Sequence, residues 1–239
     1  MPASLPTPAA PAQDETRSVL AIPAFRKLWN SMVFSSLGDW LGLLATTALA
    51  QKLSGGSYAT ANFAIAGVFI ARLLPAVFLG PIAGVIADRF DRRKLMVFSD
   101  IIRAGLYISI PIVNTYLWLY TAMILVECMT LFWSPAKEAT VPNLVGKEKL
   151  ESANQVSLLA AYGTAPIAAI LFSVLTLFAN AIEALFPFTI GGSINIALYV
   201  NAASFAFAAF TIWGLKEIPK GAAAKKAKDE GVLKSLHDG

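Results

Sequence analysis

Long apolar runs dominate the pattern of hydrophobic and polar positions in this chain. Six such runs can be separated, and the connections between them are short and contain polar residues, glycine or proline. The runs cover approximately residues 28–53, 59–87, 95–114, 116–133, 152–179 and 193–215. Because a helix of about 20 apolar residues crosses the hydrocarbon core of a bilayer, the pattern predicts an all-α membrane protein with six transmembrane helices.

Two of the predicted boundaries depend on other signals. The fourth run is expected to continue as a helix towards Pro142. Between the fifth and sixth runs, Pro187, Gly191 and Gly192 predict a break in the chain.

Indole prefers the headgroup region of a bilayer, and most of the tryptophans fall near predicted helix ends: Trp29, Trp118, Trp133 and Trp213. Trp40 is the exception, deep in the first helix.

Composition agrees with a membrane location and argues against several other classes of protein. The chain is 56% hydrophobic and 14% charged, whereas a soluble domain carries about 25% charged residues. The single Cys128 and the single His237 provide neither a disulfide nor a zinc-binding set. No nucleophile–base pair or phosphate-binding loop appears, so we expect no enzyme, no metal and no cofactor.

The basic residues lie in alternate connections between the runs. They precede the first run (Arg17, Arg26, Lys27), separate the second from the third (Arg89, Arg92, Arg93, Lys94), separate the fourth from the fifth (Lys137, Lys147, Lys149) and follow the sixth (Lys216, Lys220, Lys225, Lys226, Lys228, Lys234). Cytoplasmic loops collect Lys and Arg. The distribution therefore predicts a multi-pass protein of the plasma (inner) membrane with both termini in the cytoplasm.

The excess of basic residues gives a pI near 9.2, which is also typical of nucleic-acid-binding proteins. The positions of the charges favour the loop bias instead, with acidic lipid headgroups as the counter-surface, and no nucleic acid partner is expected. Residues 1–23 are interpreted as a disordered cytoplasmic tail without the features of a signal peptide. Residues 24–215 form the transmembrane domain, and residues 216–239 form a basic cytoplasmic linker or tail.

Three charged residues are predicted to lie deep in the bilayer: Asp39, Arg72 and Glu127. Asp39 follows Trp29 by ten residues, or roughly 15 Å of helix, which is close to the bilayer midplane. Ionisable groups at this depth cost about 2.5–3.5 kcal/mol each on insertion scales. They can line a polar cavity that holds a substrate or a proton, or they can pair internally and fix helix packing.

Asp100 and Arg103 are three residues apart in the third run, so they share a helix face. They are expected to pair structurally, within snorkelling reach of the cytoplasmic surface. In the fifth run, Gly163 and Pro166 suit either a bending element or ordinary close packing.

The connection between the second and third helices is a short charged turn, estimated at about seven residues. The segment 84–94 reads Gly-Val-Ile-Ala-Asp-Arg-Phe-Asp-Arg-Arg-Lys. Gly84, together with Gly80 and Ala83, is expected to permit close helix approach. A turn with two acids and four bases suits a latch between helices better than a passive linker.

The pattern Gly84-x-x-x-Asp88-Arg89-x-x-Arg92-Arg93 resembles motif A of the major facilitator superfamily, although Asp91 stands where that pattern has Gly. The form of the motif is similar to that of the macrolide-efflux and enterobactin-exporter branch. Further segments resemble the same branch: Ser36-Leu37-Gly38-Asp39-Trp40, Arg72-x-x-Pro75, Ser99-Asp100-x-x-Arg103, Ser134-Pro135-Ala136-x-x-Ala139-Thr140-x-Pro142, Ala153-Asn154 and Asn201-Ala-Ala-Ser-Phe205. The resemblance covers about residues 24–215.

The resemblance implies a fold of two inverted three-helix repeats, which is half of a major facilitator transporter. It places Asp39 and Glu127 on the two cavity-lining helices, where they would handle protons or cations together with Arg72. Asp88 and Arg92 would be latch residues within motif A, and Asp100 and Arg103 would support them. The implied function is export of small amphiphilic organic molecules, coupled to protons, by alternating access.

Two departures from the family pattern leave alternatives open. The family's antiporter motif ends in Gly-Pro-x-x-Gly-Gly, whereas this chain reads Gly163-Thr-Ala-Pro166-Ile-Ala-Ala. The family has twelve helices and this chain has six, so a second six-helix half or a second copy of the chain is expected as partner, besides the lipid bilayer and the small-molecule substrate. The alternatives are a truncated product, or a regulatory membrane module, without independent transport.

Overall fold

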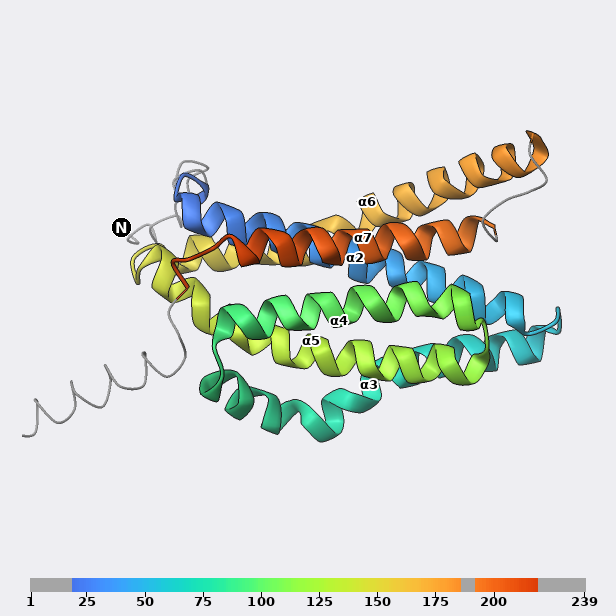
Figure 1. The fold of residues 1–239 in the computed structure, drawn as a ribbon, viewed down its shortest axis with the longest axis horizontal. Coiled ribbons are helices and arrows are strands. Elements are labelled where there is room, and N and C mark those ends of the chain that lie inside the picture. Colours follow the sequence, from blue (N-terminus) through green and yellow to red (C-terminus); the bar gives the residue numbers. More distant parts are fainter. Residues whose placement is uncertain (1–18, 186–191, 219–239) are drawn as a thin grey trace, which may run out of the picture.

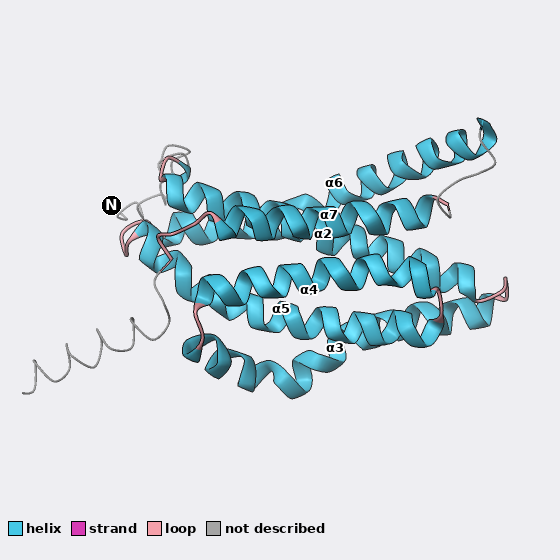
Figure 2. Cartoon of the chain, viewed as in Figure 1, coloured by secondary structure: helices cyan, strands magenta, loops and turns pink. Residues whose placement is uncertain are grey.

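The structure is a computed structural model that describes residues 19–185 and 192–218. Within the helices it does not describe the side chains at 81, 82, 85, 86, 88, 89, 180 and 182–185. The described part is helical and contains six long helices: α2 (Pro23–Leu53), α3 (Tyr58–Arg89), α4 (Arg92–Val113), α5 (Tyr116–Val145), α6 (Leu150–Leu185) and α7 (Ser193–Trp213) (Figures 1 and 2). Each contains a segment long and apolar enough to span a membrane, which confirms the six predicted helices.

The helices differ from the apolar runs mainly in length. The first helix begins at Pro23, five residues before its apolar run, because proline suits the first helical position, where its missing N–H removes no intrahelical hydrogen bond. The fourth helix continues past Pro135 and Pro142 to Val145, as predicted. The predicted disordered tail lies mostly, and the basic tail almost wholly, outside the described residues, as do Pro187 and Gly191. Gly192, with φ 87°, lies directly before α7.

The connection between α3 and α4 is tighter than the sequence suggested. Only Phe90 and Asp91 separate α3 from α4, so the estimate of about seven residues was wrong. Asp91 is the N-cap of α4, and its carboxylate accepts a hydrogen bond from the backbone N–H of Lys94. Acidic residues are favoured at this position because they satisfy one of the free N–H groups of the first turn, which gives a local reason for Asp91 where the family pattern has Gly.

The helices form two groups of three. α2 contacts α6 and α7, and α5 contacts α3 and α4. The two groups lie side by side in Figure 1 and are joined by contacts of α4 with α7 and of α2 with α3 and α5. This arrangement places α2 and α5 in contact with helices of both groups.

The closest helix approach occurs at Gly38 and Gly42 of α2. A Cβ atom on Gly38 would lie 2.6 Å from Asn201 Oδ1, and one on Gly42 would lie 2.5 Å from the Tyr107 hydroxyl. Distances this short leave no room for a side chain. Gly42 and Gly38 therefore allow the polar groups of α4 and α7 to reach the face of α2.

The close approach expected at Gly80 and Gly84 is not found within the described part of the chain. A Cβ atom on either glycine would meet no atom within 4 Å. The physical reason is the course of α3, whose C-terminal part curves away from α5 in Figure 1 and has few contacts with α4. These two glycines do not pack against the other described helices.

Candidate functional site

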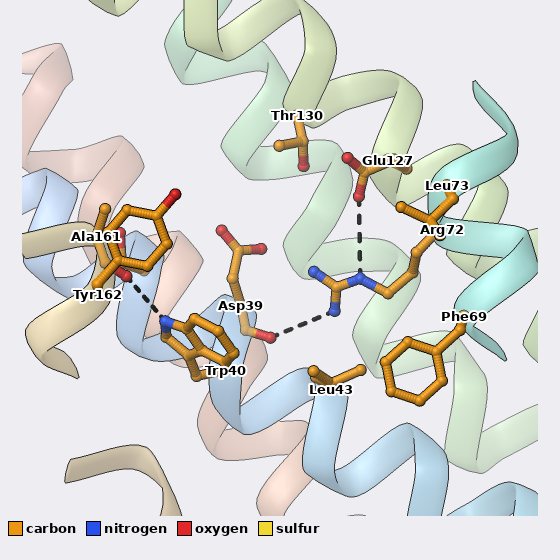
Figure 3. Close-up of a pocket in the computed structure, with 11 residues that line it drawn as sticks. Asp39, Trp40, Leu43, Phe69, Arg72, Leu73, Glu127, Thr130, Ala161 and Tyr162 are labelled. Carbon is orange, nitrogen blue, oxygen red and sulfur yellow. Dashed lines mark hydrogen bonds and ion pairs between the residues drawn. The ribbon is translucent and has the colours of Figure 1, made fainter. Parts of the chain in front are cut away.

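The intramembrane charges predicted from the sequence converge on one cavity. It has a volume of about 340 Å³ and is lined by α2, α3, α5 and α6. Its polar lining residues are Ser36, Asp39, Arg72, Glu127 and Thr130. Aromatic walls come from Trp40, Phe69 and Tyr162. Residues up to 126 positions apart in the sequence thus meet at a single site (Figure 3).

Within the cavity, Arg72 lies between Glu127 and the backbone of α2 (Figure 3). Its Nε atom is 4.0 Å from Glu127 Oε2, and its Nη1 atom donates a 3.4 Å hydrogen bond to the carbonyl oxygen of Asp39. The side chains of Arg72 and Glu127 are 20% and 17% exposed. We refer to Arg72, Glu127 and the Asp39 carbonyl as the pocket cluster. Its contacts are long and its members are open to the cavity.

A second group of charges lies behind the cavity, around Arg103 of α4. Arg103 pairs with Asp100 and donates hydrogen bonds to Ser35 of α2 and Thr130 of α5. The indole of Trp133 donates to the other oxygen of Asp100 at 3.2 Å. We refer to these five side chains as the buried cluster. Asp100 and Arg103 have no exposed surface, so the ion pair of this cluster is closed to solvent and lipid, while Thr130 also lines the cavity.

Asp39 connects the two clusters. Its carboxylate oxygen Oδ2 lies 3.7 Å from Arg103 Nη1, while its carbonyl accepts from Arg72. The Asp39 side chain is 27% exposed, and its Oδ1 atom has no hydrogen-bond partner among the described residues. Asp39 therefore touches a buried cation on one side and the cavity on the other.

The charges of the two clusters balance only without the Asp39 carboxylate, which lies between them. Asp39, Asp100 and Glu127 supply three carboxyl groups, whereas Arg72 and Arg103 supply two guanidinium groups. A guanidinium does not lose its proton in a protein, so only the carboxyl groups can adjust. In a low-dielectric environment an uncompensated carboxylate is costly, which favours uptake of one proton or another cation.

The structure changes the expectation for Asp100 and Arg103. The two side chains pair, as their spacing predicted, but they do not reach towards the cytoplasmic surface. They point into the protein instead, where the Arg103 guanidinium also lies 4.3 Å from the centre of the Phe205 ring. Trp133 does not mark a helix end either, because α5 continues for twelve residues beyond it. Its indole is buried, where it bonds to Asp100.

Several residues of the site were not predicted as functional. Ser35 and Thr130 are small hydroxyl side chains in apolar helices, and no local signal distinguishes them from packing residues. Tyr107 and Asn201 are fully buried beside Gly42. Only Trp40 could have been identified from the sequence as part of the site. It lies at mid-helix, where an indole N–H needs a hydrogen-bond acceptor on another segment.

Two tryptophans of α2 attach this helix to α6. Trp29 Nε1 donates to the carbonyl of Val156 at 3.0 Å, and Trp40 Nε1 donates to the carbonyl of Ala161 at 2.8 Å. Pro166 follows five residues later and lacks the N–H that would continue the helix ladder. Trp40 therefore fixes the cavity wall just before the proline in α6.

The motif at the junction of α3 and α4 lies apart from the cavity. Arg92 is buried, and its Nη1 atom donates a 2.9 Å hydrogen bond to the Ala139 carbonyl of α5. Arg93 is half-buried and Gly84 lies in the curved part of α3. The side chains of Asp88 and Arg89 are outside the described ones. Arg92 thus joins the start of α4 to the later part of α5.

Known proteins are similar to this chain over most of its length. Residues 15–239 match the family model described as transmembrane secretion effector. YfiS, an uncharacterised MFS-type transporter of Bacillus subtilis, is 29% identical over 222 residues, which make up 89% of this chain and 47% of YfiS.

Two further relatives are the macrolide efflux protein A of Enterococcus faecalis and that of Streptococcus pyogenes. Each is 35% identical over 121 residues, which make up 47% of this chain and 37% and 29% of the respective relative. This chain therefore spans less than half the length of these three relatives. Since the family model covers nearly all of its residues, the chain belongs to the transmembrane secretion effector family of the major facilitator superfamily, whose members are multi-pass membrane transporters and not enzymes.

Proposed function

We propose that this chain is one six-helix half of an exporter that moves small amphiphilic organic molecules across the plasma (inner) membrane in exchange for protons. The observation that carries the proposal is the convergence of Asp39, Arg72 and Glu127 on one cavity inside the membrane-spanning bundle. Charged residues within transmembrane helices are costly and commonly mark a transport pathway. Two relatives are named macrolide efflux protein A, which agrees with export as the direction of transport.

Proton coupling is supported by the charge imbalance between the clusters. Among the described residues, the charged and titratable groups near Asp39 and Glu127 are Arg72 on α3, Asp100, Arg103 and Tyr107 on α4, and Cys128 on α5. Because neither arginine can release a proton, a proton taken up by this network must reside on a carboxyl group. Asp39 and Glu127 are the carboxyl groups that line the cavity, so they are the proposed proton sites, while Asp100 stays paired inside the buried cluster.

The proposed mechanism is alternating access by two inverted three-helix repeats. If α2–α4 correspond to α5–α7, then contacts of α2 with α6 and α7 should be matched by contacts of α5 with α3 and α4, and α4 should contact α7. All of these helix pairs are in contact, which supports the repeat. The two cavity-lining helices α2 and α5 are equivalent in this scheme.

The motif between α3 and α4 is proposed to latch the inner end of the protein in one transport state. The hydrogen bond from Arg92 to the Ala139 carbonyl supports this proposal, because it connects the start of α4 to the later part of α5. Asp88 is the proposed acidic partner in the latch, and Asp100 and Arg103 support it through α4. The alternation of basic connections supports an orientation with both termini in the cytoplasm.

A partner is needed to close the cavity on the side away from this chain. The cavity-lining helices α3 and α6 carry large exposed apolar side chains, among them Leu73, Val77, Tyr162 and Ile167. A separate six-helix half or a second copy of this chain would cover them. The native mass of the chain, extracted gently from its own membrane, distinguishes the two partners from a chain that remains alone.

The proposal is tested by proton flux in proteoliposomes that contain the chain, its partner and a pH-sensitive dye. A macrolide is the first substrate to add, because two relatives are named for macrolide efflux. We expect macrolide-driven proton flux, and we expect Asp39→Asn and Glu127→Gln each to lower it by about tenfold or more. The control is Glu138→Gln, since Glu138 lies on the same helix as Glu127 but is 69% exposed. Unchanged flux in the Asp39 and Glu127 variants would contradict the assignment of the proton sites.

A further inference from the structure

Arg72 has few polar contacts for an arginine inside a membrane-spanning bundle, and these contacts are long. Its guanidinium carries five N–H donors, yet its contacts in the described part of the chain are one ion pair at 4.0 Å and one hydrogen bond at 3.4 Å. Both are at the outer limit of such interactions. A guanidinium with long contacts on a flexible side chain can move away from them at low cost.

Arg103 shows what a fixed arginine looks like in the same protein. It is fully buried and contacts Asp39, Asp100, Ser35 and Thr130, with aromatic rings on its faces. Arg72 is 20% exposed and faces the cavity. The difference indicates that Arg72 occupies a place in the cavity without being locked there.

The sign of the charge that the cavity can accept follows from the groups around it. The three carboxyl groups of Asp39, Asp100 and Glu127 exceed the two guanidinium groups by one. An added organic cation would compensate this excess, whereas an added anion would enlarge it. Coulomb interactions of this kind are strong away from bulk water, so the network selects for a positively charged ligand.

The walls of the cavity suit the body of such a ligand. Trp40, Phe69 and Tyr162 lie around the charges from three different helices (Figure 3). The faces of aromatic rings attract cations, and the cavity volume of about 340 Å³ lies within the range typical of small-molecule sites. Carboxylates combined with aromatic rings provide both the charge and the apolar contact of an organic ammonium or phosphonium ion.

We propose that the cavity binds an organic cation with an apolar body, and that this cation displaces the Arg72 guanidinium from Glu127 and from the Asp39 carbonyl. In the absence of ligand, Arg72 acts as a resident cation and competes with the ligand for the same carboxylate. This proposal rests on the proposed function in one respect, since it takes this cavity to be the transport cavity.

The test uses tetraphenylphosphonium and tetraphenylborate, two ions of the same shape and opposite charge. The purified full chain, with its partner if one is found, is placed in lipid nanodiscs, and bound ligand is measured by equilibrium dialysis. Binding to empty nanodiscs is subtracted, because both ions partition into lipid. We expect protein-specific affinity for the cation to exceed that for the anion by about tenfold or more.

Substitutions in the cavity separate competition by Arg72 from a merely structural role. Arg72→Gln removes the resident cation, so we expect it to raise the affinity for tetraphenylphosphonium by about threefold to tenfold. Glu127→Gln removes the shared carboxylate and is expected to lower that affinity by about tenfold. A side chain that only supported the fold would lower the affinity when removed, or leave it unchanged.

Matched controls come from Lys137 and Glu138 of α5. These two side chains form an ion pair at 3.9 Å and do not line the cavity. Lys137→Gln and Glu138→Gln remove the same charges as the two test variants, and we expect neither to change the affinity for tetraphenylphosphonium. If they shift it as much as the cavity variants do, the effect comes from overall charge and the proposal is overturned.

The proposal is also overturned if tetraphenylborate binds as tightly as tetraphenylphosphonium, or if Arg72→Gln weakens or does not change cation binding. Its failure can be distinguished from failure of the transport proposal. Macrolide-driven proton flux without specific cation binding would overturn the cation site and leave transport standing. Cation binding that tightens in Arg72→Gln, together with an absence of flux, would support the site and count against proton coupling.

Discussion

The pocket cluster and the buried cluster use the same chemistry in opposite surroundings. Each contains an arginine beside a carboxylate, yet Arg103 and Asp100 have no exposed surface, while Arg72 and Glu127 are open to a cavity. The buried arginine has four polar partners, of which Asp100 is the closest, whereas the cavity arginine has two partners, both at long distance. In our proposal the buried pair is a fixed part of the fold and the cavity pair is an exchangeable part of a site, and burial distinguishes the two.

Asp39 connects the two clusters physically. It contacts Arg103 through its side chain and Arg72 through its carbonyl. Asp39 thus links any change of charge in the cavity to the buried guanidinium of Arg103. We expect the buried cluster to hold the geometry of α2, α4 and α5, and we propose that the pocket cluster changes partners.

The largest difference between the clusters is expected when each loses its arginine. Arg103→Met leaves Asp100 buried without its cation, so we expect the free energy of unfolding to fall by about 3–5 kcal/mol. Arg72→Met should lower it by about 1 kcal/mol or less, because its pair is long and partly exposed. Unfolding in mixtures of detergent and sodium dodecyl sulfate measures both values.

A double substitution checks the reason for the loss in Arg103→Met. Adding Asp100→Leu removes the uncompensated carboxylate, and replacing a buried ion pair by apolar side chains is often close to neutral. We therefore expect the double variant to recover most of the lost free energy of unfolding. Equal losses for the Arg103 and Arg72 variants would contradict the distinction between the two clusters.

A smaller difference is expected between two indole donors. Trp133 donates to the buried Asp100 carboxylate and Trp40 donates to the Ala161 carbonyl. Hydrogen bonds to charged groups contribute about 1.5–3 kcal/mol and neutral ones about 0.5–1.5 kcal/mol. We expect Trp133→Phe to lower the free energy of unfolding more than Trp40→Phe by about 1 kcal/mol. A larger loss of unfolding free energy in Trp40→Phe than in Trp133→Phe would contradict this prediction and show that the hydrogen bond at the cavity contributes more.

A further difference concerns the free space at two glycines, Gly42 beside the buried groups of α4 and α7 and Gly84 in α3. Gly42 faces the Tyr107 hydroxyl and the Asn201 amide with no room for a methyl group, whereas Gly84 faces open space. Gly42→Ala should cost about 1–3 kcal/mol of unfolding free energy through overpacking. Gly84→Ala should change it by less than about 0.5 kcal/mol. Thermal unfolding of the two variants in the same detergent provides the comparison, and a loss at Gly84 would indicate a contact absent from the described part of the chain.

Much of the architecture was predictable because it follows from local patterns. Apolar runs about 20 residues long determine six membrane-spanning helices, since the bilayer leaves no other way to satisfy their backbone groups. The depth of Asp39, Arg72 and Glu127 along their helices also follows from residue spacing, and these three side chains line one cavity.

Other features were predicted incorrectly because they depend on contacts between distant segments. The spacing of Asp100 and Arg103 predicts a pair but not its direction, and only the positions of Ser35 and Thr130 on other helices show that Arg103 points inwards. Trp133 resembled a marker of the bilayer surface until its partner was known to be Asp100. Gly84 resembled a packing glycine, whereas the close approach occurs at Gly38 and Gly42.

The sequence by itself determined how many helices cross the membrane, where charges lie along them and which family the chain resembles, because hydropathy and spacing are properties of single segments. The tertiary structure alone decided which charges share a cavity and which are sealed behind it. Hydrophobic length fixes the depth of a residue, but helix rotation and packing fix its neighbours, and these arise from contacts among α2, α4, α5 and α7. Arg103 has Asp100 three residues away in the sequence and Arg72 has no acidic neighbour there. Only packing brings Glu127 to Arg72 at the cavity and closes Arg103 off behind it.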